Sequence, residues 1–275
     1  MSRTAVYSAL VLRSRPSGES NSEVTLLTAE EGIIRATVFG GPKSKLRAHS
    51  APYNSGQVWV YRDPAKEYGK LSDFDVRSWR PGLRELYERT MAASALSETI
   101  LCTHGGGGDW GEALKLASAT LDALESANEE LCPRLLVHFL WRWAGFLGIQ
   151  PHIESCAVCG DRAASGPLWF SAREGSVLCG SCVPKDEINF QNQALSPMSS
   201  KELSSNELSS KELSSVPGML LLNPGSRRWL TAVEPLEPAL LYRYSMDGKS
   251  FHEAKSLACA VLTAALGKRL GSWEW

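Results

Sequence analysis

The sequence has no apolar run that approaches the ~20 residues of a membrane-spanning helix. The first residues, Met1 to Thr4, lead into an alternating segment and lack the apolar run and cleavage site of a signal peptide. We therefore expect a cytoplasmic protein with no membrane contact. The chain also lacks G-x-S-x-G, H-E-x-x-H and Walker motifs, and its five histidines are scattered. These absences argue against an enzyme and favour a protein that acts by binding.

Four of the seven cysteines form two pairs, Cys156-Ala-Val-Cys159 and Cys179-Gly-Ser-Cys182, separated by nineteen residues. A C-x2-C turn lets two thiolates converge on one ion, and two such turns complete a tetrahedron. The pattern predicts one structural zinc ion per chain, held by Cys156, Cys159, Cys179 and Cys182. Four thiolates leave no open position for a substrate, so we expect no chemistry at this zinc. His152 is close enough in sequence to replace a weak ligand.

The other three cysteines, Cys102, Cys132 and Cys259, each lie in an apolar helical pattern. The odd total and a reducing compartment argue against a disulfide framework, so we expect these three to be small buried side chains.

The formal net charge is only -1, but the charges are unevenly distributed. Residues 1–80 hold twelve Lys and Arg against eight Asp and Glu, so the remainder of the chain carries an acidic excess. A locally basic N-terminal region joined to a more acidic body fits a protein that meets polyanions at one end.

Residues 1–80 read as short strands separated by turns, with segments 4–12, 24–28, 33–39, 57–62 and 71–79 as the five expected strands. Gly32 marks a hairpin turn between the second and the third. Five short strands in under ninety residues predict a small barrel or sandwich. Trp59, Tyr61 and Tyr53 could stack on bases there, or could simply fill the interior.

Helical periodicity replaces the alternation after Arg80-Pro81-Gly82. We expect a helix toward Cys102, a loop at the tetraglycine 105–108, a second helix capped by Asp109, and a central core helix at about 133–147. The chain then carries the zinc module at 151–190. A low-complexity insertion follows at 191–216, whose Ser-Ser-Lys-Glu-Leu repeat we expect to be disordered, with a solvated amphipathic helix as the alternative. The closing part, 217–275, returns to helix, with Asp247 or Ser250 as its cap, and is expected to pack on the helical domain of 81–150.

Three cations alternate in the segment Gly40-Gly41-Pro42-Lys43-Ser44-Lys45-Leu46-Arg47. If this segment is extended, Lys43, Lys45 and Arg47 project from one side and suit a row of phosphates. Arg35 is a weaker candidate for the same role. A solvated basic loop is the competing interpretation, and the basic excess around the segment makes the two about equal.

The order of these parts resembles the bacterial RecO family of recombination-repair proteins. The matching stretches run from Glu19 to Thr28 and on to Glu31-Gly32, from Phe39 to Lys45, from Phe146 to Pro151, from Cys156 to Gly160 and from Gly175 to Cys179. The resemblance covers most of the chain except 192–216. It implies an α+β multi-domain protein in which an N-terminal OB-fold β-barrel binds DNA and precedes a helical domain with an inserted four-cysteine zinc module.

The resemblance also implies a function: a nucleoid-associated mediator of recombinational repair that binds single- and double-stranded DNA. It would anneal complementary strands and help load RecA on DNA coated with single-strand binding protein, with that protein and RecR as partners. The competing hypothesis is a zinc-containing interaction adaptor without intrinsic DNA affinity. A zinc-ribbon nuclease or transferase is a third and weaker alternative.

Overall fold

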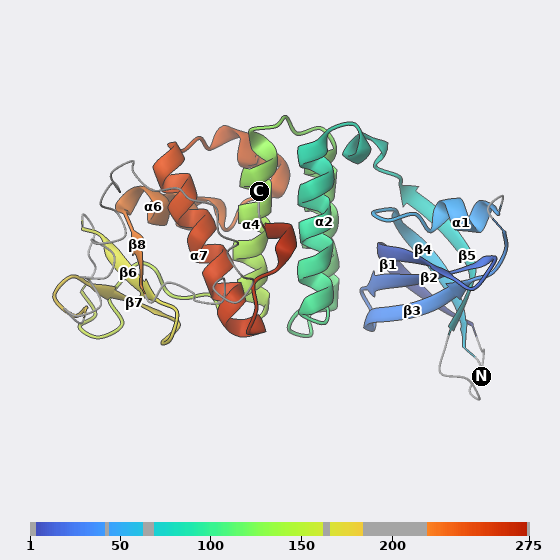
Figure 1. The fold of residues 1–275 in the computed structure, drawn as a ribbon, viewed down its shortest axis with the longest axis horizontal. Coiled ribbons are helices and arrows are strands. Elements are labelled where there is room, and N and C mark those ends of the chain that lie inside the picture. The colour runs from blue at the N-terminus through green and yellow to red at the C-terminus, as the bar shows by residue number, and fades with distance from the viewer. Residues whose placement is uncertain (1–3, 42–43, 63–68, 162–165, 184–218, 274–275) are drawn as a thin grey trace, which may run out of the picture. The chain divides into compact units, whose positions relative to one another are not determined.

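The computed structural model describes residues 4–41, 44–62, 69–161, 166–183 and 219–273 (Figure 1). The chain divides into two compact units. The first comprises Met1–Gly148, Pro235–Arg243 and Leu270–Trp275, and the second comprises Ile149–Glu234 and Tyr244–Arg269. Each unit is therefore assembled from segments that lie far apart in the sequence. The Ser-Ser-Lys-Glu-Leu repeat and Lys43 lie outside the described residues.

The first unit begins with a closed five-stranded barrel in the order β1-β2-β3-β5-β4. Its strands are β1 (Thr4–Ser17), β2 (Asn21–Thr28), β3 (Gly32–Val38), β4 (Ser55–Arg62) and β5 (Gly69–Ser78), with the short helix α1 (Lys45–His49) between β3 and β4. Neighbouring strands are antiparallel except β3 and β5, which are parallel. The predicted barrel with the arrangement of an OB fold is confirmed.

Alternation along the strands separates the inside of the barrel from its outside. Twelve buried side chains fill the interior, among them Leu26, Val58 and Phe74. The predicted hairpin at Gly32 is also confirmed, with a left-handed φ of 69° that a side chain rarely adopts. A Cβ there would lie 2.7 Å from the Trp110 ring, so the turn also accommodates a neighbouring helix.

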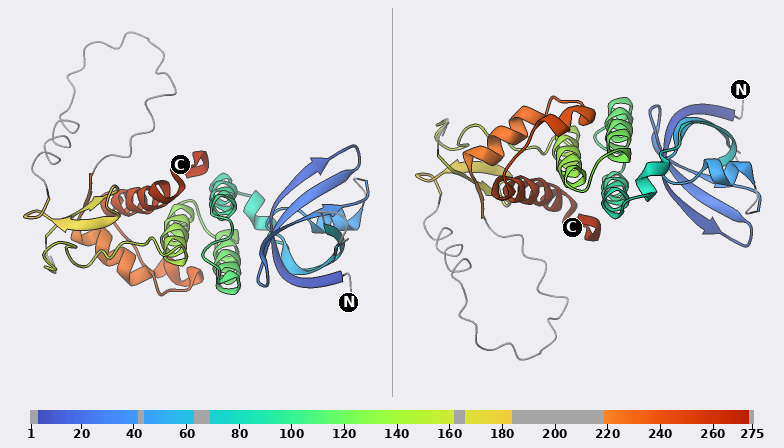
Figure 2. Two further views of the ribbon diagram at one scale, coloured as in Figure 1. Left: turned by 90° about the horizontal axis from the view of Figure 1, so that it is seen from below. Right: turned by 90° about the horizontal axis from the view of Figure 1, so that it is seen from above.

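Helices make up the rest of the first unit: α2 (Tyr87–Cys102), α3 (Trp110–Glu125), α4 (Leu131–Phe146) and the short turns η1 (Pro81–Arg84), η2 (Pro238–Arg243) and η3 (Gly271–Trp273). The three long helices lie side by side (Figure 2). The tetraglycine is the loop between α2 and α3, and the Asp109 carboxylate caps α3 by accepting from the Glu112 amide at 3.1 Å.

Helix α4 is the centre of this packing, as its broad apolar face predicted. Trp141 and Trp143 are 1% and 0% exposed, so neither is available to a nucleic acid. The Trp143 indole donates to the Thr103 hydroxyl at 2.9 Å, which satisfies its one polar atom. Between the two tryptophans, Arg142 reaches out to donate to the Leu236 carbonyl at 3.1 Å. The interpretation of these residues as core is confirmed.

The second unit contains the sheet β7-β6-β8 and two helices. Its elements are β6 (Leu168–Ser171), β7 (Ser176–Cys179), β8 (Met219–Leu222), α6 (Pro224–Val233) and α7 (Gly248–Leu266). Asp247 caps α7 by accepting from the Ser250 amide at 2.9 Å. The prediction that the chain returns directly to helix after Gly218 was wrong, because residues 219–222 pair with β6 as a third strand before α6 begins.

None of the helices in the described part of the chain is both long and apolar enough to cross a membrane.

Candidate metal centre and nucleic-acid interface

The two cysteine pairs converge in the second unit. Cys156 and Cys159 lie on a turn that precedes β6, Cys179 ends β7, and Cys182 lies on the turn that follows it. The four Sγ atoms all lie within 4.8 Å of one another. Within the described residues no histidine or carboxylate joins this group, so His152 is not part of it.

Backbone hydrogen bonds shape each pair into a tight turn. The Gly160 amide donates to the Cys156 carbonyl at 3.0 Å, and the Val183 amide donates to the Cys179 carbonyl at the same distance. The Ala157 amide donates to the Val177 carbonyl at 2.9 Å and so attaches the first turn to β7. The turns are therefore held by the backbone, and the sulfur atoms are left to face one another.

The sulfur positions fit a tetrahedral metal ion. Cys159 Sγ and Cys179 Sγ are 3.7 Å apart, and a tetrahedron with Zn–S bonds of ~2.3 Å has edges of about 3.8 Å. A disulfide would require an S–S distance of about 2.05 Å, and all seven cysteines are free thiols. The four cysteines could hold a metal ion, and thiolate ligands in this number leave no coordination position open.

The backbone around the cluster also favours a thiolate. Burial raises the pKa of the Cys156 thiol, but hydrogen bonds from the amides of Cys159, Cys179 and Val158 outweigh burial and lower that pKa to about 6. Hydrogen bonds with the Cys179 and Cys159 sulfurs raise the pKa of Cys182 to about 12. The charge of the Cys156 thiolate adds to these hydrogen bonds in raising the pKa of Cys182.

The cation segment after β3 has a different shape from the one predicted. Residues 45–49 form α1, so the extended arrangement was wrong for Lys45 and Arg47. Residues two positions apart on an α-helix are separated by about 200° around its axis. The side chains of Lys45 and Arg47 therefore point away from each other instead of lining one side. The helical turn lets Leu46 pack against the barrel core, and the His49 Nδ1 lies 2.8 Å from the Phe74 carbonyl, to which it donates in the Nδ1–H tautomer. The contact of the partly buried Leu46 with the barrel core is compatible with this helical turn.

Arg35 is exposed on the outer side of β3, between the inward-facing Ile34 and Ala36. Its register partner on β2 is Thr25, and the partner of Thr25 on β1 is Arg13. Sequence reasoning missed Arg13 because the two arginines are 22 positions apart. Strict alternation from the inward-facing Tyr7, Ala9 and Val11 would place Arg13 inside the barrel. The register shift between Val11 and Arg13 instead pairs Arg13 with Thr25, and so brings it into one row with Arg35.

The aromatic candidates separate into two kinds. Trp59 and Tyr61 flank the inward-facing Val60, so both face outward. Tyr53 is half-buried, with its pKa raised by burial, and its hydroxyl is bonded to Ser94. Phe39, which was not a candidate, is 42% exposed directly after β3. The outer face of the barrel therefore offers the rings of Trp59, Tyr61 and Phe39, whereas the Tyr53 hydroxyl is engaged by Ser94.

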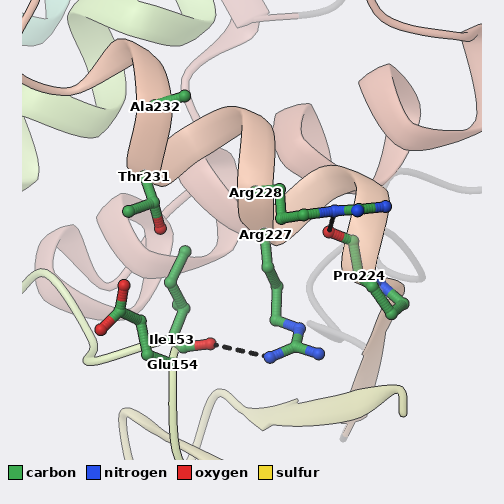
Figure 3. A pocket seen from close by; sticks show the side chains of 7 residues that line it. All are labelled: Ile153, Glu154, Pro224, Arg227, Arg228, Thr231 and Ala232. Carbon is green, nitrogen blue, oxygen red and sulfur yellow. Dashed lines mark hydrogen bonds between the residues drawn. The ribbon is translucent and has the colours of Figure 1, made fainter. Parts of the chain in front are cut away.

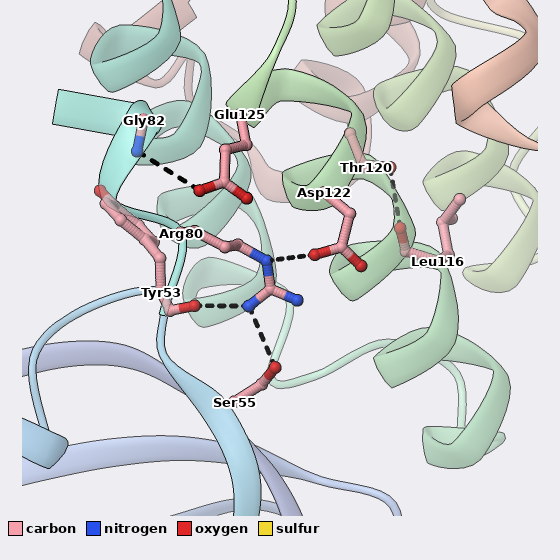
Figure 4. Close-up of polar contacts among 8 residues, drawn as sticks. All are labelled: Tyr53, Ser55, Arg80, Gly82, Leu116, Thr120, Asp122 and Glu125. Carbon is pink, nitrogen blue, oxygen red and sulfur yellow. Dashed lines mark hydrogen bonds and ion pairs between the residues drawn. The ribbon is translucent and has the colours of Figure 1, made fainter. Parts of the chain in front are cut away.

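A buried arginine links the barrel to the helices of the first unit (Figure 4). Arg80 is 2% exposed, and its guanidinium donates to Asp122 Oδ1 at 2.6 Å, to the Tyr53 carbonyl at 2.6 Å and to Ser55 Oγ at 3.0 Å. Its backbone has a left-handed φ of 46°, which is uncommon for a residue with a side chain. Arg80 had been counted with the basic excess, but it is structural and cannot meet DNA.

The second unit has a recess of about 350 Å³ beside α6 (Figure 3). Its lining residues are Ile153, Glu154, Pro224, Arg227, Arg228, Thr231 and Ala232. Arg227 donates to the Ile153 carbonyl at 3.4 Å and to the Gly166 carbonyl at 2.6 Å. Burial, followed by the charge of Arg228, lowers the pKa of Arg227. These hydrogen bonds hold Ile153 and Gly166 against α6, so Arg227 has an architectural role.

Comparison with known proteins matches both parts of the chain to one family. Residues 1–79 match the family description "Recombination protein O N terminal", and residues 84–198 match "Recombination protein O C terminal". A "DNA repair protein RecO" from Desulfitobacterium hafniense is 30% identical over 176 residues, which is 63% of each chain. Proteins of the same name from Pelotomaculum thermopropionicum and Exiguobacterium sibiricum are each 31% identical, and the match covers 67% and 70% of their lengths. The matched region thus spans just under two thirds of the Desulfitobacterium relative.

Proposed function

Because the chain belongs to the RecO family of DNA repair and recombination proteins, we propose that it is a recombination mediator that binds single- and double-stranded DNA. In this role it anneals complementary strands and, with RecR, loads RecA on DNA covered by single-strand binding protein. It acts by binding and catalyses no covalent reaction.

The observation that carries the DNA-binding proposal is the closed barrel with cations on its outside. Arg35 and Lys45 are exposed, and Arg47 is half-exposed. None of the three forms an ion pair with another described residue, so each is available to a phosphate. We assign phosphate contacts to these residues and to Lys43.

We further propose that the four cysteines bind one zinc ion per chain. Zinc would tie the turn at 156–159 to the turn at 179–182 and so stabilise the β7-β6-β8 sheet. The chain's own contribution is the pair of backbone-bonded turns, which bring the sulfurs to the spacing that a tetrahedral ion requires.

Salt dependence of DNA binding tests the cation assignment. A Lys43/Lys45/Arg47→Ala variant should lose affinity and should show a shallower dependence of log K on log salt, by about 0.7 for each lost contact to a single strand. A variant with the exposed cations Lys249, Lys268 and Arg269 replaced by Ala removes the same charge from the second unit and serves as control. Equal slopes for the two variants would remove Lys43, Lys45 and Arg47 from the site.

One observation favours the adaptor as a second candidate. Val158 lies between two of the cluster cysteines and is 69% exposed, so it offers a partner an apolar contact beside the cluster. Capture of RecR or single-strand binding protein, with no DNA affinity at ~50 mM salt, would favour the adaptor over the DNA-binding mediator.

A further inference from the structure

The outer face of the barrel carries a row of side chains that crosses three strands. Arg13 on β1, Thr25 on β2 and Arg35 on β3 are successive register partners. Neighbouring strands lie about 4.8 Å apart, so the backbones of the two arginines are separated by about 9.6 Å, with only a threonine between them. Two like charges are thus held near each other on a rigid surface.

No carboxylate of the described residues forms an ion pair with either arginine. The Nε of Arg13 is buried and has no hydrogen-bond partner, which leaves a donor of a charged group unsatisfied. Glu23 occupies the next outward position on β2, where its register partners are Arg15 and Thr37. An anion between Arg13 and Arg35 would therefore meet two cations that no described carboxylate neutralises.

The same face continues to an aromatic side chain. Lys70 on β5 is the register partner of Thr37, which lies two residues after Arg35 on β3. The Lys70 Nζ lies 5.5 Å from the centroid of the Phe39 ring, and Phe39 is 42% exposed. The face therefore presents two arginines and, beyond them, the flat apolar ring of Phe39 with the Lys70 ammonium group beside it.

We infer that this face, comprising Arg13, Arg35, Lys70 and Phe39, is a platform for unpaired nucleotides. Phe39 stacks on one base, while Arg13, Arg35 and Lys70 hold the adjoining phosphates. A ring can take a base only when that base is free of its duplex neighbours, so the platform discriminates in favour of single strands. The inference deepens the proposed DNA binding and rests on it.

Phe39→Ala tests the platform without changing the charge. Anisotropy titrations at ~50 mM salt would use an oligothymidylate of ~16 nucleotides, an abasic strand of equal length and a duplex. The variant should bind the oligothymidylate about 5- to 150-fold more weakly, the range expected for one stacked base, while abasic and duplex affinities stay unchanged. Phe39→Trp should restore the oligothymidylate affinity.

Two companion variants separate stacking from charge and from general surface effects. Tyr87→Ala removes a 72% exposed ring at the start of α2 and should leave all three affinities unchanged. Lys70→Ala should weaken binding to all three nucleic acids and reduce the salt slope for single strands by about 0.7, whereas Phe39→Ala should keep the native slope.

The outcomes are distinguishable from failure of the proposed function. If the native protein binds the oligothymidylate but Phe39→Ala binds it equally well, or loses abasic and duplex affinity to the same extent, the platform is wrong and DNA binding stands. If the native protein binds none of the three nucleic acids, both proposals fall.

Discussion

The barrel and the cysteine module, which comprises the two C-x2-C turns and the sheet β7-β6-β8, are stabilised by different interactions. The barrel closes on itself and buries twelve interior side chains. The sheet β7-β6-β8 has three strands of only four residues each, and the four cysteines beside it face one another. Small sheets of this kind have marginal stability unless a metal ion, a disulfide or additional packing supports them. Stability should therefore depend on metal in one region and on apolar burial in the other.

Metal removal should have the largest effect on stability, and it should affect the cysteine module without affecting the barrel. Apparent binding free energies of structural zinc are about 10–16 kcal/mol in small domains, so chelation should unfold the cysteine module. Hydrogen exchange should accelerate in the turns at 156–159 and 179–182 and remain slow in β1 to β3. Cys159→Ser should behave like chelation, and Cys102→Ser, outside the cluster, should not. A native protein without metal would contradict the zinc assignment.

Removal of a barrel core side chain should give the reverse pattern. Phe74 is 1% exposed, and Phe74→Ala should lower the free energy of unfolding by about 3–5 kcal/mol through lost burial and a cavity. Urea denaturation measures this loss, and elemental analysis should still find one zinc per chain. Phe39→Ala, at a 42% exposed site of the same barrel, should change stability by less than about 0.5 kcal/mol. Loss of zinc from the Phe74 variant would show that the regions are coupled.

Arg80→Ala should have an intermediate effect because its charged hydrogen bonds join the barrel to α3. The Tyr53 carbonyl and Ser55 hydroxyl would lose their donor, at a cost of about 2–4 kcal/mol in unfolding free energy. Asp122 is half-exposed and can be rehydrated, so the loss should fall short of that for a fully buried pair. Arg77→Ala, at an exposed position of β5, is the control and should be nearly neutral. Equal unfolding midpoints for the two variants would rule out the structural role of Arg80.

The smallest effect should come from Glu23→Gln. This variant tests the barrel as a DNA-binding surface, in contrast to the structural role of the cysteine module. Loss of an exposed negative charge beside Arg15 should tighten DNA binding a few-fold, or at most about 1 kcal/mol, without changing stability. The gain should vanish at high salt, where screening shortens the Debye length. Glu129→Gln, at an exposed position before α4, should leave affinity unchanged; a matching gain there would indicate a nonspecific charge effect.

Several elements could be predicted from local patterns. The period-2 alternation identified all five barrel strands, although β1 continues to Ser17 beyond the expected end at Leu12. Asp109 was predicted as a cap, and Asp247 was one of two alternatives, because capping involves residues only three apart. Strand β8 was missed because four apolar residues before a helix carry no periodicity that separates strand from helix.

The candidate binding site was harder to predict than the candidate metal centre. The C-x2-C spacing alone placed all four cysteines together, because each pair is a local turn with little freedom. The alternation of Lys45 and Arg47 implied one face only for an extended chain, whereas the segment is a short helix whose Leu46 is partly buried against the barrel. Arg80 carried no signal that distinguished a buried structural cation from a DNA contact.

The sequence by itself determined the strand and helix periods, the caps and the cysteine set, since all of these follow from residues within a few positions of one another. Only the tertiary structure decided that Arg13 and Arg35 flank Thr25, that Lys70 lies beside Phe39 and that Arg80 is buried. These arrangements depend on strand register and barrel closure, in which small free-energy differences summed over many distant contacts select one partner among several.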